Sequence, residues 1–330
     1  MSIKDNYFVS VVTPVFNGGK YLRECIESVL SQTYKNYEYI IQNNFSTDRT
    51  NEIANEYSVK DHKIKVYNTN TLLPMVENWN DTLRKISSKS KYCKVLHADD
   101  RLYPECLEKM VEVAERSSNI GIVGSYALLG TEVKLDGLPE DQIIINGKKL
   151  CRLTLNRKIF LFGSPTNLLY KSELIRKRRQ FYNQKFFHAD TEVCYDILQN
   201  YDFGFVHQIL SYTRLHNESQ TEILSKKYNT NLVEYLAMLN KYCPTYLSGT
   251  EYKNLAKRRK KKFYIDLAGN IFQYLNKPFR DYIVKKNKEL GIGFSNLKLL
   301  YYLLIIIIDK FLNPKRTIST FLKKYVSSRK

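Results

Sequence analysis

Two adjacent carboxylates, Asp99 and Asp100, follow a short, mostly apolar run in the first third of the chain. The run 95–98 predicts the end of a buried strand, and Pro104 predicts the start of the next helix. Two neighbouring acids at the end of a strand repel each other unless a cation lies close to both. Because ligands of open α/β sheets bind at this edge, the pair predicts a site for a divalent metal ion and a phosphate group. The alternative is that one Asp only caps the helix, and these residues alone leave both interpretations open.

Three further groups of polar residues have types and positions that suit catalysis or binding. The loop 42–48 follows the second predicted strand and lies at the same sheet edge, although its composition is also typical of a turn and a helix cap. Asp190 opens a predicted helix, where a carboxylate either caps the helix or accepts a proton from an attacking hydroxyl. Arg214 and His216 share one face at a strand end, where they bind phosphate or metal or lie on the surface.

A sheet with alternating helices would bring these residues together. Strands are predicted at 9–16, 37–42, 63–67 and 120–125, and a further strand ends at Asp99. Helices are predicted at 21–30, 75–86 and 104–117, and another begins at a cap in 46–48 and continues to residue 57. Such alternation implies parallel pairing, so we expect an α/β fold with a mostly parallel, doubly wound central sheet flanked by helices.

After residue 126 the predicted elements are shorter. They are a mostly helical segment at 149–162, a turn at 163–167, strands at 168–170, 203–206 and 209–214, and a helix at 190–200. From residue 225 onward only helical patterns with basic faces occur. We therefore expect a catalytic domain at 1–224 and a basic helical region at 225–330 that serves a membrane surface or assembly.

The composition and charge support this division. The 330 residues are 43% hydrophobic and carry a net charge of +19, and the part from residue 226 holds 23 lysines and arginines against 6 acids. A cationic region of this kind indicates an anionic partner, either nucleic acid or acidic lipid. Six scattered cysteines without a C-x-x-C pair, and an N-terminus without a signal-peptide pattern, predict reduced thiols in a cytoplasmic protein.

The basic region contains ten consecutive apolar residues, 299–308, between Lys298 and Lys310. A bilayer-spanning helix needs about 20 residues, so this run is too short to cross. We expect it to lie on an anionic membrane surface, with a buried helix as the alternative. Further flanking cations are at Lys315, Arg316, Lys323 and Lys324.

Four segments occur in the order found in a known enzyme family. They are 9–17 (VSVVTPVFN), 28–33 (SVLSQT), 46–48 (STD) and 97–100 (HADD). Over about residues 8–220 the chain resembles the family 2 glycosyltransferases, which have the GT-A fold. The resemblance implies an inverting enzyme that uses a nucleotide-diphosphate sugar and a divalent metal, manganese or magnesium.

The resemblance also implies where the nucleoside binds. Thr13, Pro14 and the loop containing Asn43 and Asn44 would line its pocket. The family commonly has an acidic residue at Asn44 or Asn43, which accepts a hydrogen bond from uracil. Because an amide donates as well as accepts, this chain is expected to favour UDP-sugars with less selectivity for the base.

The same resemblance assigns roles to the remaining candidates. Asp99 would contact the ribose and the sugar, and Asp100 would bind the metal. Asp190 would be the general base that deprotonates the acceptor hydroxyl. In the segment 214–221, which resembles one that closes over the diphosphate, Arg214 would bind phosphate and His216 metal or phosphate.

We therefore predict transfer of a sugar to a hydroxyl of a saccharide or lipid-linked saccharide during surface glycan synthesis, peripherally on the inner face of the cytoplasmic membrane. One alternative is a nucleic-acid-binding protein that uses the basic region, but the α/β part lacks the charge excess and a known nucleic-acid motif, so we expect no nucleic acid partner. Another is a nucleotidyltransferase, which would have a glycine-rich basic loop near the start. No G-x-G-x-x-G or P-loop follows a predicted strand, which argues against dehydrogenases and P-loop ATPases.

Overall fold

The computed structural model describes residues 7–216, 224, 225 and 227–314. The chain divides into two compact units, residues 1–219 and 220–330. The predicted domain boundary after residue 224 lies beside the segment 217–223, which is outside the described residues. Each unit buries its own set of apolar side chains.

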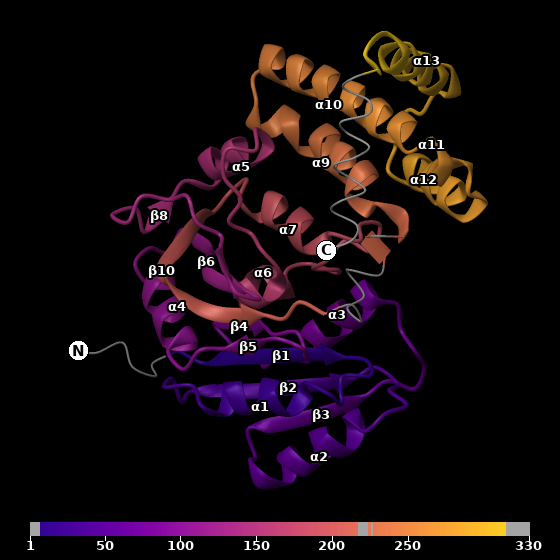
Figure 1. The fold of residues 1–330 in the computed structure, drawn as a ribbon. Coiled ribbons are helices and arrows are strands. Elements are labelled where there is room, and N and C mark those ends of the chain that lie inside the picture. Colours follow the sequence, from indigo (N-terminus) through magenta and orange to yellow (C-terminus); the bar gives the residue numbers. More distant parts are fainter. Residues whose placement is uncertain (1–6, 217–223, 226, 315–330) are drawn as a thin grey trace. The chain divides into compact units, whose positions relative to one another are not determined.

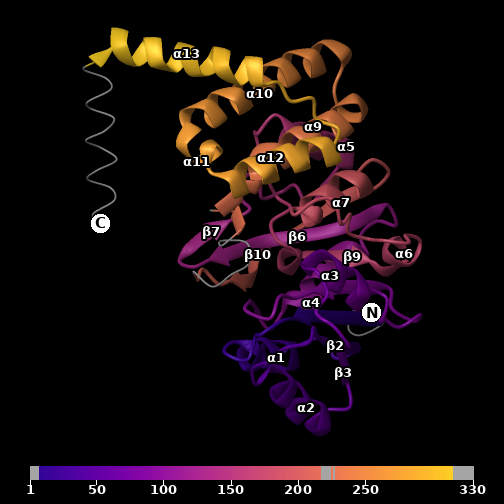
Figure 2. The ribbon, with the colours of Figure 1, turned by 90° about the vertical axis from the view of Figure 1, so that its right-hand side faces the viewer.

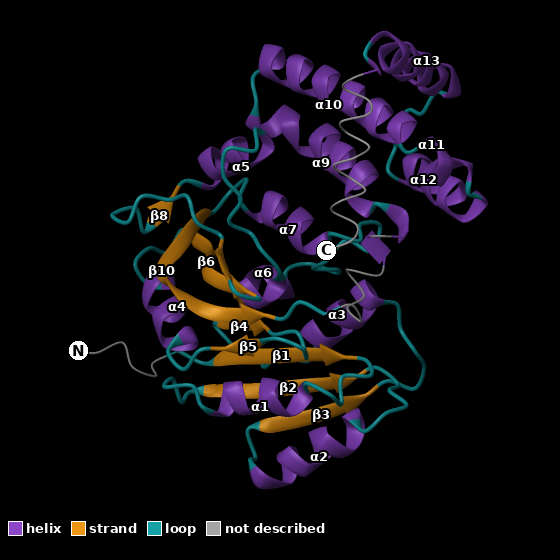
Figure 3. Ribbon diagram, viewed as in Figure 1, coloured by secondary structure: helices purple, strands orange, loops and turns teal. Residues whose placement is uncertain are grey.

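The first unit is built on one sheet of ten strands flanked by helices (Figure 1 and Figure 3). The strands are β1 (Val9–Val15), β2 (Tyr37–Asn43), β3 (Ile64–Asn68), β4 (Tyr92–Val95), β5 (Arg101–Leu102), β6 (Ile120–Leu129), β7 (Glu132–Lys134), β8 (Ile144–Ile145), β9 (Leu168–Lys171) and β10 (Asp202–Thr213). Their order is β3-β2-β1-β4-β9-β6-β10-β5, with β7 beside β6 and β8 beside β10.

Most central strands run in one direction. β1 pairs in parallel with β2 and β4, and β6 pairs in parallel with β10. β9 is antiparallel to both β4 and β6, which keeps β4 and β6 parallel to each other. Every residue of β1 and β2 is buried, because helices cover this sheet, and both strands have the apolar, β-branched or aromatic composition that such burial requires. The predicted α/β class with a mostly parallel sheet is confirmed.

The helices of the first unit are amphipathic and pack against this sheet. They are α1 (Leu22–Leu30), α2 (Thr50–Lys60), α3 (Met75–Leu83), α4 (Cys106–Ala114), α5 (Gly147–Leu155), α6 (Ser172–Arg176) and α7 (Ala189–Ile197), with a short 3₁₀ helix η1 (Pro165–Asn167). In α1 the buried residues recur at three- and four-residue spacing, as the sequence pattern predicts. The six cysteines are buried and form no disulfide with one another, in agreement with the expectation of reduced thiols.

Three elements differ from the prediction. The ladder of β4 ends at Val95, and the next residues form a turn in which the N–H of Asp100 donates to the carbonyl of His97 at 3.0 Å. The carboxylates therefore lie on a loop and not on the strand itself. The segments 203–206 and 209–214 form the single strand β10, whose register shifts between Val206 and Ile209. The helix expected at 149–162 ends at Leu155.

In the described residues of the second unit, the regular elements are all helices. They are α9 (Thr230–Tyr246), α10 (Gly249–Gly269), α11 (Ile271–Leu275), α12 (Lys277–Glu289) and α13 (Asn296–Leu312). Its core includes a stack of three aromatic rings, in which Tyr264 lies between Phe294 at 5.9 Å and Tyr302 at 6.0 Å. Leu299 of α13 is buried, whereas most other apolar residues of this helix are exposed (α13 is labelled in Figure 2).

The apolar run 299–308 is part of helix α13. In the described part of the chain, no helix combines the length and the apolar character that a membrane crossing requires. The flanking cations Lys315, Arg316, Lys323 and Lys324 lie outside the described residues.

Candidate active site

The candidate residues follow the carboxyl ends of strands that point the same way. Asn44 follows β2, Asp99 and Asp100 follow β4, and Arg214 and His216 follow β10. Since these strands are parallel, their carboxyl ends meet at one edge of the sheet. Residues more than 100 positions apart in the sequence are thereby brought into contact.

Asp99 and His216 form a direct pair at this edge. His216 Nε2 lies 2.9 Å from Asp99 Oδ2, and both side chains are partly exposed, at 16% and 31% respectively. The His216 ring packs on Tyr21, with ring centroids 5.1 Å apart. The pair therefore presents a carboxylate and an imidazole to solvent from two distant loops.

Arg214 is held beside this pair by several contacts. Its Nε donates to the backbone carbonyl of Asp99 at 3.1 Å, and one terminal nitrogen donates to Glu24 at 2.8 Å. The guanidinium also lies over the ring of Tyr21, 4.5 Å from its centroid. These contacts fix the guanidinium beside the loop that carries Asp99, where it forms an ion pair with Glu24.

Asp100 is buried, and both of its carboxylate oxygens accept hydrogen bonds. Oδ1 accepts the backbone N–H of Arg214 at 3.0 Å, and Oδ2 accepts the hydroxyl of Thr166 at 2.6 Å. Burial, together with the negative charge of Asp99, raises the pKa of the Asp100 carboxyl well above its usual range, and these hydrogen bonds offset only part of the effect. Asp100 thus joins the β4 loop to η1 and to the end of β10.

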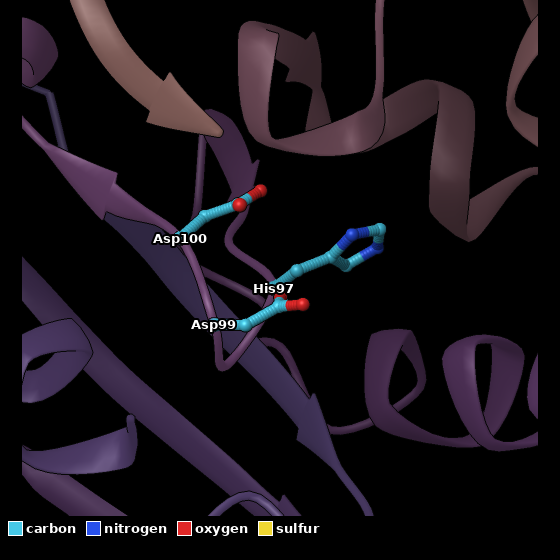
Figure 4. A group of neighbouring side chains, drawn as sticks. All are labelled: His97, Asp99 and Asp100. Carbon is cyan, nitrogen blue, oxygen red and sulfur yellow. The ribbon is translucent and has the colours of Figure 1, made fainter. Parts of the chain in front are cut away.

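His97 is a further member of the cluster, to which the sequence analysis assigned no role. In Figure 4 the side chains of His97, Asp99 and Asp100 extend from the loop to the same side. The ring packs on Trp79, with centroids 5.1 Å apart, and burial lowers the pKa of His97, which keeps the imidazole neutral. The signals that could have identified this part of the site are the place of His97 in the 97–100 segment and the presence of a single tryptophan in the chain.

Asp190 lies in the first turn of α7, as predicted. One of its oxygens accepts the N–H of Thr191 at 2.8 Å. Burial, and then the negative charge of Asp190, raise the pKa of the Tyr182 phenol. Tyr182 packs edge-on against Trp79, which in turn covers His97. A chain of aromatic contacts therefore links Tyr182 to His97 of the Asp99 cluster.

Asn43 and Asn44 have different environments at the end of β2. The amide of Asn43 donates to Asn68 at 2.8 Å and its oxygen accepts the N–H of Ser46 at 3.2 Å. Asn44 bonds through both ends of its amide to the backbone of Leu73, at 2.9 Å in each case. Asn44 therefore positions the loop before α3.

Thr13 and Pro14 lie in the buried strand β1. The hydroxyl of Thr13 is 3.0 Å from the hydroxyl of Tyr39, inside the core. Pro14 pairs in register with Gln42 of β2, next to Asn43 and Asn44. Thr13 is thus part of the core of the sheet, and Pro14 lies beside the two asparagines at the carboxyl edge.

The donor atoms at this edge fit a divalent metal ion. Among the described residues, one ligand atom each from His97, Asp99 and Asp100 lies within 4.8 Å of the others. In the same part of the chain, Nε2 of His97 and Nδ1 of His216 are buried without hydrogen-bond partners. Carboxylate oxygens and neutral imidazole nitrogens are ligands that suit Mn²⁺, and the oxygens also suit Mg²⁺.

Comparison with known proteins agrees with this arrangement. Residues 10–179, just over half of the chain, match the model of Glycosyl transferase family 2. An uncharacterized glycosyltransferase of Haemophilus influenzae is 26% identical over 69% of this chain and 74% of its own length. A putative teichuronic acid biosynthesis glycosyltransferase, TuaG, of Bacillus subtilis is 32% identical over 41% of this chain, which spans about half of that relative.

Solved structures show the same fold at low sequence identity. S. aureus TarS 1-349 in complex with UDP-GlcNAc is 14% identical, with a TM-score of 0.62 over 90% of this chain and 87% of that one. The mannosyltransferase PcManGT from Pyrobaculum calidifontis in complex with GDP-Man and Mn²⁺ is also 14% identical, with a TM-score of 0.56 over 91% of this chain and 88% of that one.

Proposed function

Since this chain belongs to glycosyl transferase family 2 and is a glycosyltransferase, we propose that it transfers a sugar from a nucleotide-diphosphate sugar to a hydroxyl of a saccharide or lipid-linked saccharide, with inversion. The observation that carries the proposal is the meeting of Asp99, Arg214 and His216 at the carboxyl edge of the sheet. A carboxylate, a guanidinium and an imidazole at one edge suit a diphosphate and its counter-ion.

The donor is proposed to bind with its nucleoside over the ends of β1 and β2. Thr13 and Pro14 would form the floor, and Asn43 and Asn44 would border it. A UDP-sugar is favoured, which agrees with the UDP-GlcNAc bound to TarS, while the GDP-Man bound to PcManGT indicates that this fold also accepts a purine. Because Asn44 is bonded to Leu73, its oxygen is only partly available to a base.

The cluster of His97, Asp99 and Asp100 is best placed to hold a divalent ion, with Asp99 as its exposed carboxylate and His216 bonded to Asp99. When bound, such an ion would neutralise negative charge on the departing diphosphate. Asp100, the ligand expected from the family resemblance, already accepts one hydrogen bond on each oxygen, from Thr166 and Arg214, so that metal binding would use its remaining lone pairs. We therefore assign to Asp100 chiefly the task of holding Arg214 and the β4 loop in place.

Asp190 is proposed to remove the proton from the acceptor hydroxyl as that oxygen attacks the anomeric carbon. Its place in the first turn of α7 suits a carboxylate, and its charge acts on Tyr182, whose ring contacts lead through Trp79 to His97 at the donor edge. One carboxylate is sufficient, because an inverting transfer is a single displacement in which the diphosphate leaves without a second acid.

The second unit is proposed to attach the enzyme to the inner face of the cytoplasmic membrane, near a lipid-linked acceptor for a surface glycan. Leu300, Leu304 and Ile308 of α13 are 52%, 50% and 56% exposed, and Lys298 and Lys310 flank them. An exposed apolar helix beside cations is typical of helices that lie in a membrane interface. The name of the relative TuaG, which refers to teichuronic acid biosynthesis, supports a surface glycan.

A thermal-shift screen of nucleotide sugars tests the enzymatic proposal. A UDP-sugar with Mn²⁺ is expected to raise the Tm, and a ligand at 100 times its Kd stabilises by about 2.7 kcal/mol. Without Mn²⁺ the shift should be smaller, because the diphosphate loses its counter-ion. The proposal is wrong if no nucleotide sugar shifts the Tm with or without the metal.

A further inference from the structure

A hollow in the first unit, separate from the carboxyl edge, is lined by four arginines. It lies between the end of α3 and the region of α6, two helices near each other in Figure 1 and Figure 2, and its volume is about 270 Å³. The arginines are Arg84, Arg176, Arg178 and Arg179. This volume is close to the lower limit of small-molecule sites, about 300 Å³.

Two of these arginines are paired with carboxylates and two are not. Arg178 bonds to Asp196 at 2.8 Å, and Arg84 lies 3.4 Å from Asp81. Arg176 donates through one terminal nitrogen to the carbonyl of Ser90 at 2.9 Å, and Arg179 has no ion pair among the described residues. Two guanidinium groups are therefore held at one hollow without an anionic partner in the described structure.

The chemistry of the unpaired groups favours phosphate as the ligand. Each guanidinium donates up to five hydrogen bonds in a planar fork that matches phosphate oxygens. A carboxylate has two oxygens and one charge, which a single arginine can satisfy. A phosphate group offers more oxygens and up to two negative charges, so it can bond to Arg176 and Arg179 together.

Apart from Asn80 and Ser88, the rest of the lining is apolar. Ile86, Ile175 and Phe181 border the hollow and are themselves largely buried, at 8%, 5% and 5% exposure. A free inorganic ion would make no use of these side chains. A phosphate that carries an apolar chain would contact both parts of the lining, and each buried CH₂ group contributes about 0.8 kcal/mol.

The hollow is distinct from the donor edge. Helix α3 begins beside Leu73, which bonds to Asn44 at the carboxyl edge, and it ends at Leu83 in the hollow. Its nine residues extend about 14 Å. Ser88 of the hollow precedes β4, which begins at Tyr92, so the hollow lies at the amino edge of the sheet.

We propose that this arginine-lined hollow is a binding site for a phosphate group attached to an apolar chain, as in a phospholipid or a prenyl phosphate. The site is independent of sugar transfer, so its test requires no catalytic activity. A failure here would leave the glycosyltransferase assignment intact, and a failed donor screen would leave this site intact.

The test uses the full-length protein and isothermal titration calorimetry in buffer without divalent metal. The probes are monomeric dihexanoyl phosphatidic acid and inorganic pyrophosphate. The phosphatidic acid is expected to bind the wild type, and the double variant Arg176→Gln/Arg179→Gln should bind it at least about tenfold more weakly. The control Lys60→Gln/Arg116→Gln removes the same charge elsewhere on the first unit and should bind like the wild type.

Each contrary outcome overturns a definite part of the proposal. Equal binding by the wild type and the hollow variant would show that the arginines hold no phosphate. If the control variant loses as much affinity for phosphatidic acid as the hollow variant, the loss is caused by the change in overall charge and not by the hollow. If pyrophosphate binds the wild type as tightly as the lipid does, and the hollow variant binds both equally weakly, the ligand is a free phosphate. The proposal that the ligand carries an apolar chain is then wrong. Unchanged Tm values of both variants establish that they fold.

Discussion

Both compact units contain buried ionisable groups and exposed apolar side chains, such as Glu234 in the second and Val59 in the first, but they differ in which kind is prominent. In the first unit, charged groups are buried, including Asp100 at the site and Lys94 in β4. In the second unit, apolar side chains are exposed along α13, such as Leu304 and Ile308. Buried charge and exposed apolar surface both cost free energy in water. The difference indicates that a polar ligand is expected at the first unit and an apolar surface at the second.

The largest effect is expected on kcat, when the proposed general base Asp190 of the first unit is replaced. Replacement Asp190→Asn removes the proposed base but keeps the shape and the helix position, so kcat should fall by about 10²- to 10⁴-fold. Donor binding, measured by thermal shift with a UDP-sugar, should remain. Turnover near that of the wild type would eliminate Asp190 as the base.

The second prediction concerns α13. The double variant Leu304→Glu/Ile308→Glu places charge on the exposed apolar face, and flotation with anionic vesicles should fall by about 100-fold, since each apolar side chain contributes about 1.5–3 kcal/mol on burial. The matched control Val59→Glu/Phe272→Glu changes two residues that are 88% and 87% exposed elsewhere. If the control loses binding as much as the α13 variant, the membrane contact is not at α13. Transfer to a soluble acceptor should be unchanged in both.

A third experiment separates the two neighbouring carboxylates. Asp99→Ala should weaken Mn²⁺ binding by about 10- to 100-fold, as followed by the electron paramagnetic resonance of free Mn²⁺, with little change in stability. Asp100→Ala should lower the free energy of unfolding by about 1–3 kcal/mol, because the Thr166 hydroxyl and the Arg214 amide lose their acceptor. The exposed Asp136→Ala serves as control. If Asp100→Ala weakens Mn²⁺ binding and Asp99→Ala does not, Asp100 is the metal ligand.

The smallest effect is expected at Lys94, which is buried in β4 and donates to the sulfur of Met110 at 3.3 Å. Burial lowers the pKa of Lys94, so the unfolded chain binds more protons than the folded one between that pKa and about 10.4. Wild-type stability should therefore rise with pH across this window. Lys94→Met should be more stable by about 1–2 kcal/mol at neutral pH in urea unfolding, and the gain should shrink toward pH 10. A constant gain would contradict the titration argument.

Local patterns were sufficient to predict much of the catalytic unit. The strands at 9–16, 37–42 and 63–67 and the helices at 21–30 and 104–117 appear within a few residues of their expected places. Apolar periodicity reports burial directly, and a parallel sheet with helices on it buries whole strands. Where the prediction failed, as at the end of β4, hydrogen bonds within a turn took the place of the ladder.

The contacts of the site were beyond such patterns. Asp100 bonds to Thr166 and to Arg214, which are 66 and 114 positions away, and Asp99 bonds to His216 at a separation of 117. The sequence placed these residues at strand ends, but it contained no information on which of two adjacent acids would be buried. The side chain of Trp79, which connects the cluster to Tyr182, was likewise not expected at the site.

The amino-acid sequence by itself determined the α/β class, the order of strands and helices, the charge difference between the two regions, and the set of polar residues at strand ends. Only the tertiary structure decided that Asp99 faces solvent with His216 while Asp100 is buried, that most of α13 is exposed, and that four arginines share one hollow. The physical reason is that periodicity is a property of neighbouring residues along the chain. Burial, pairing and the pKa of a carboxyl depend instead on groups that the fold brings from distant positions.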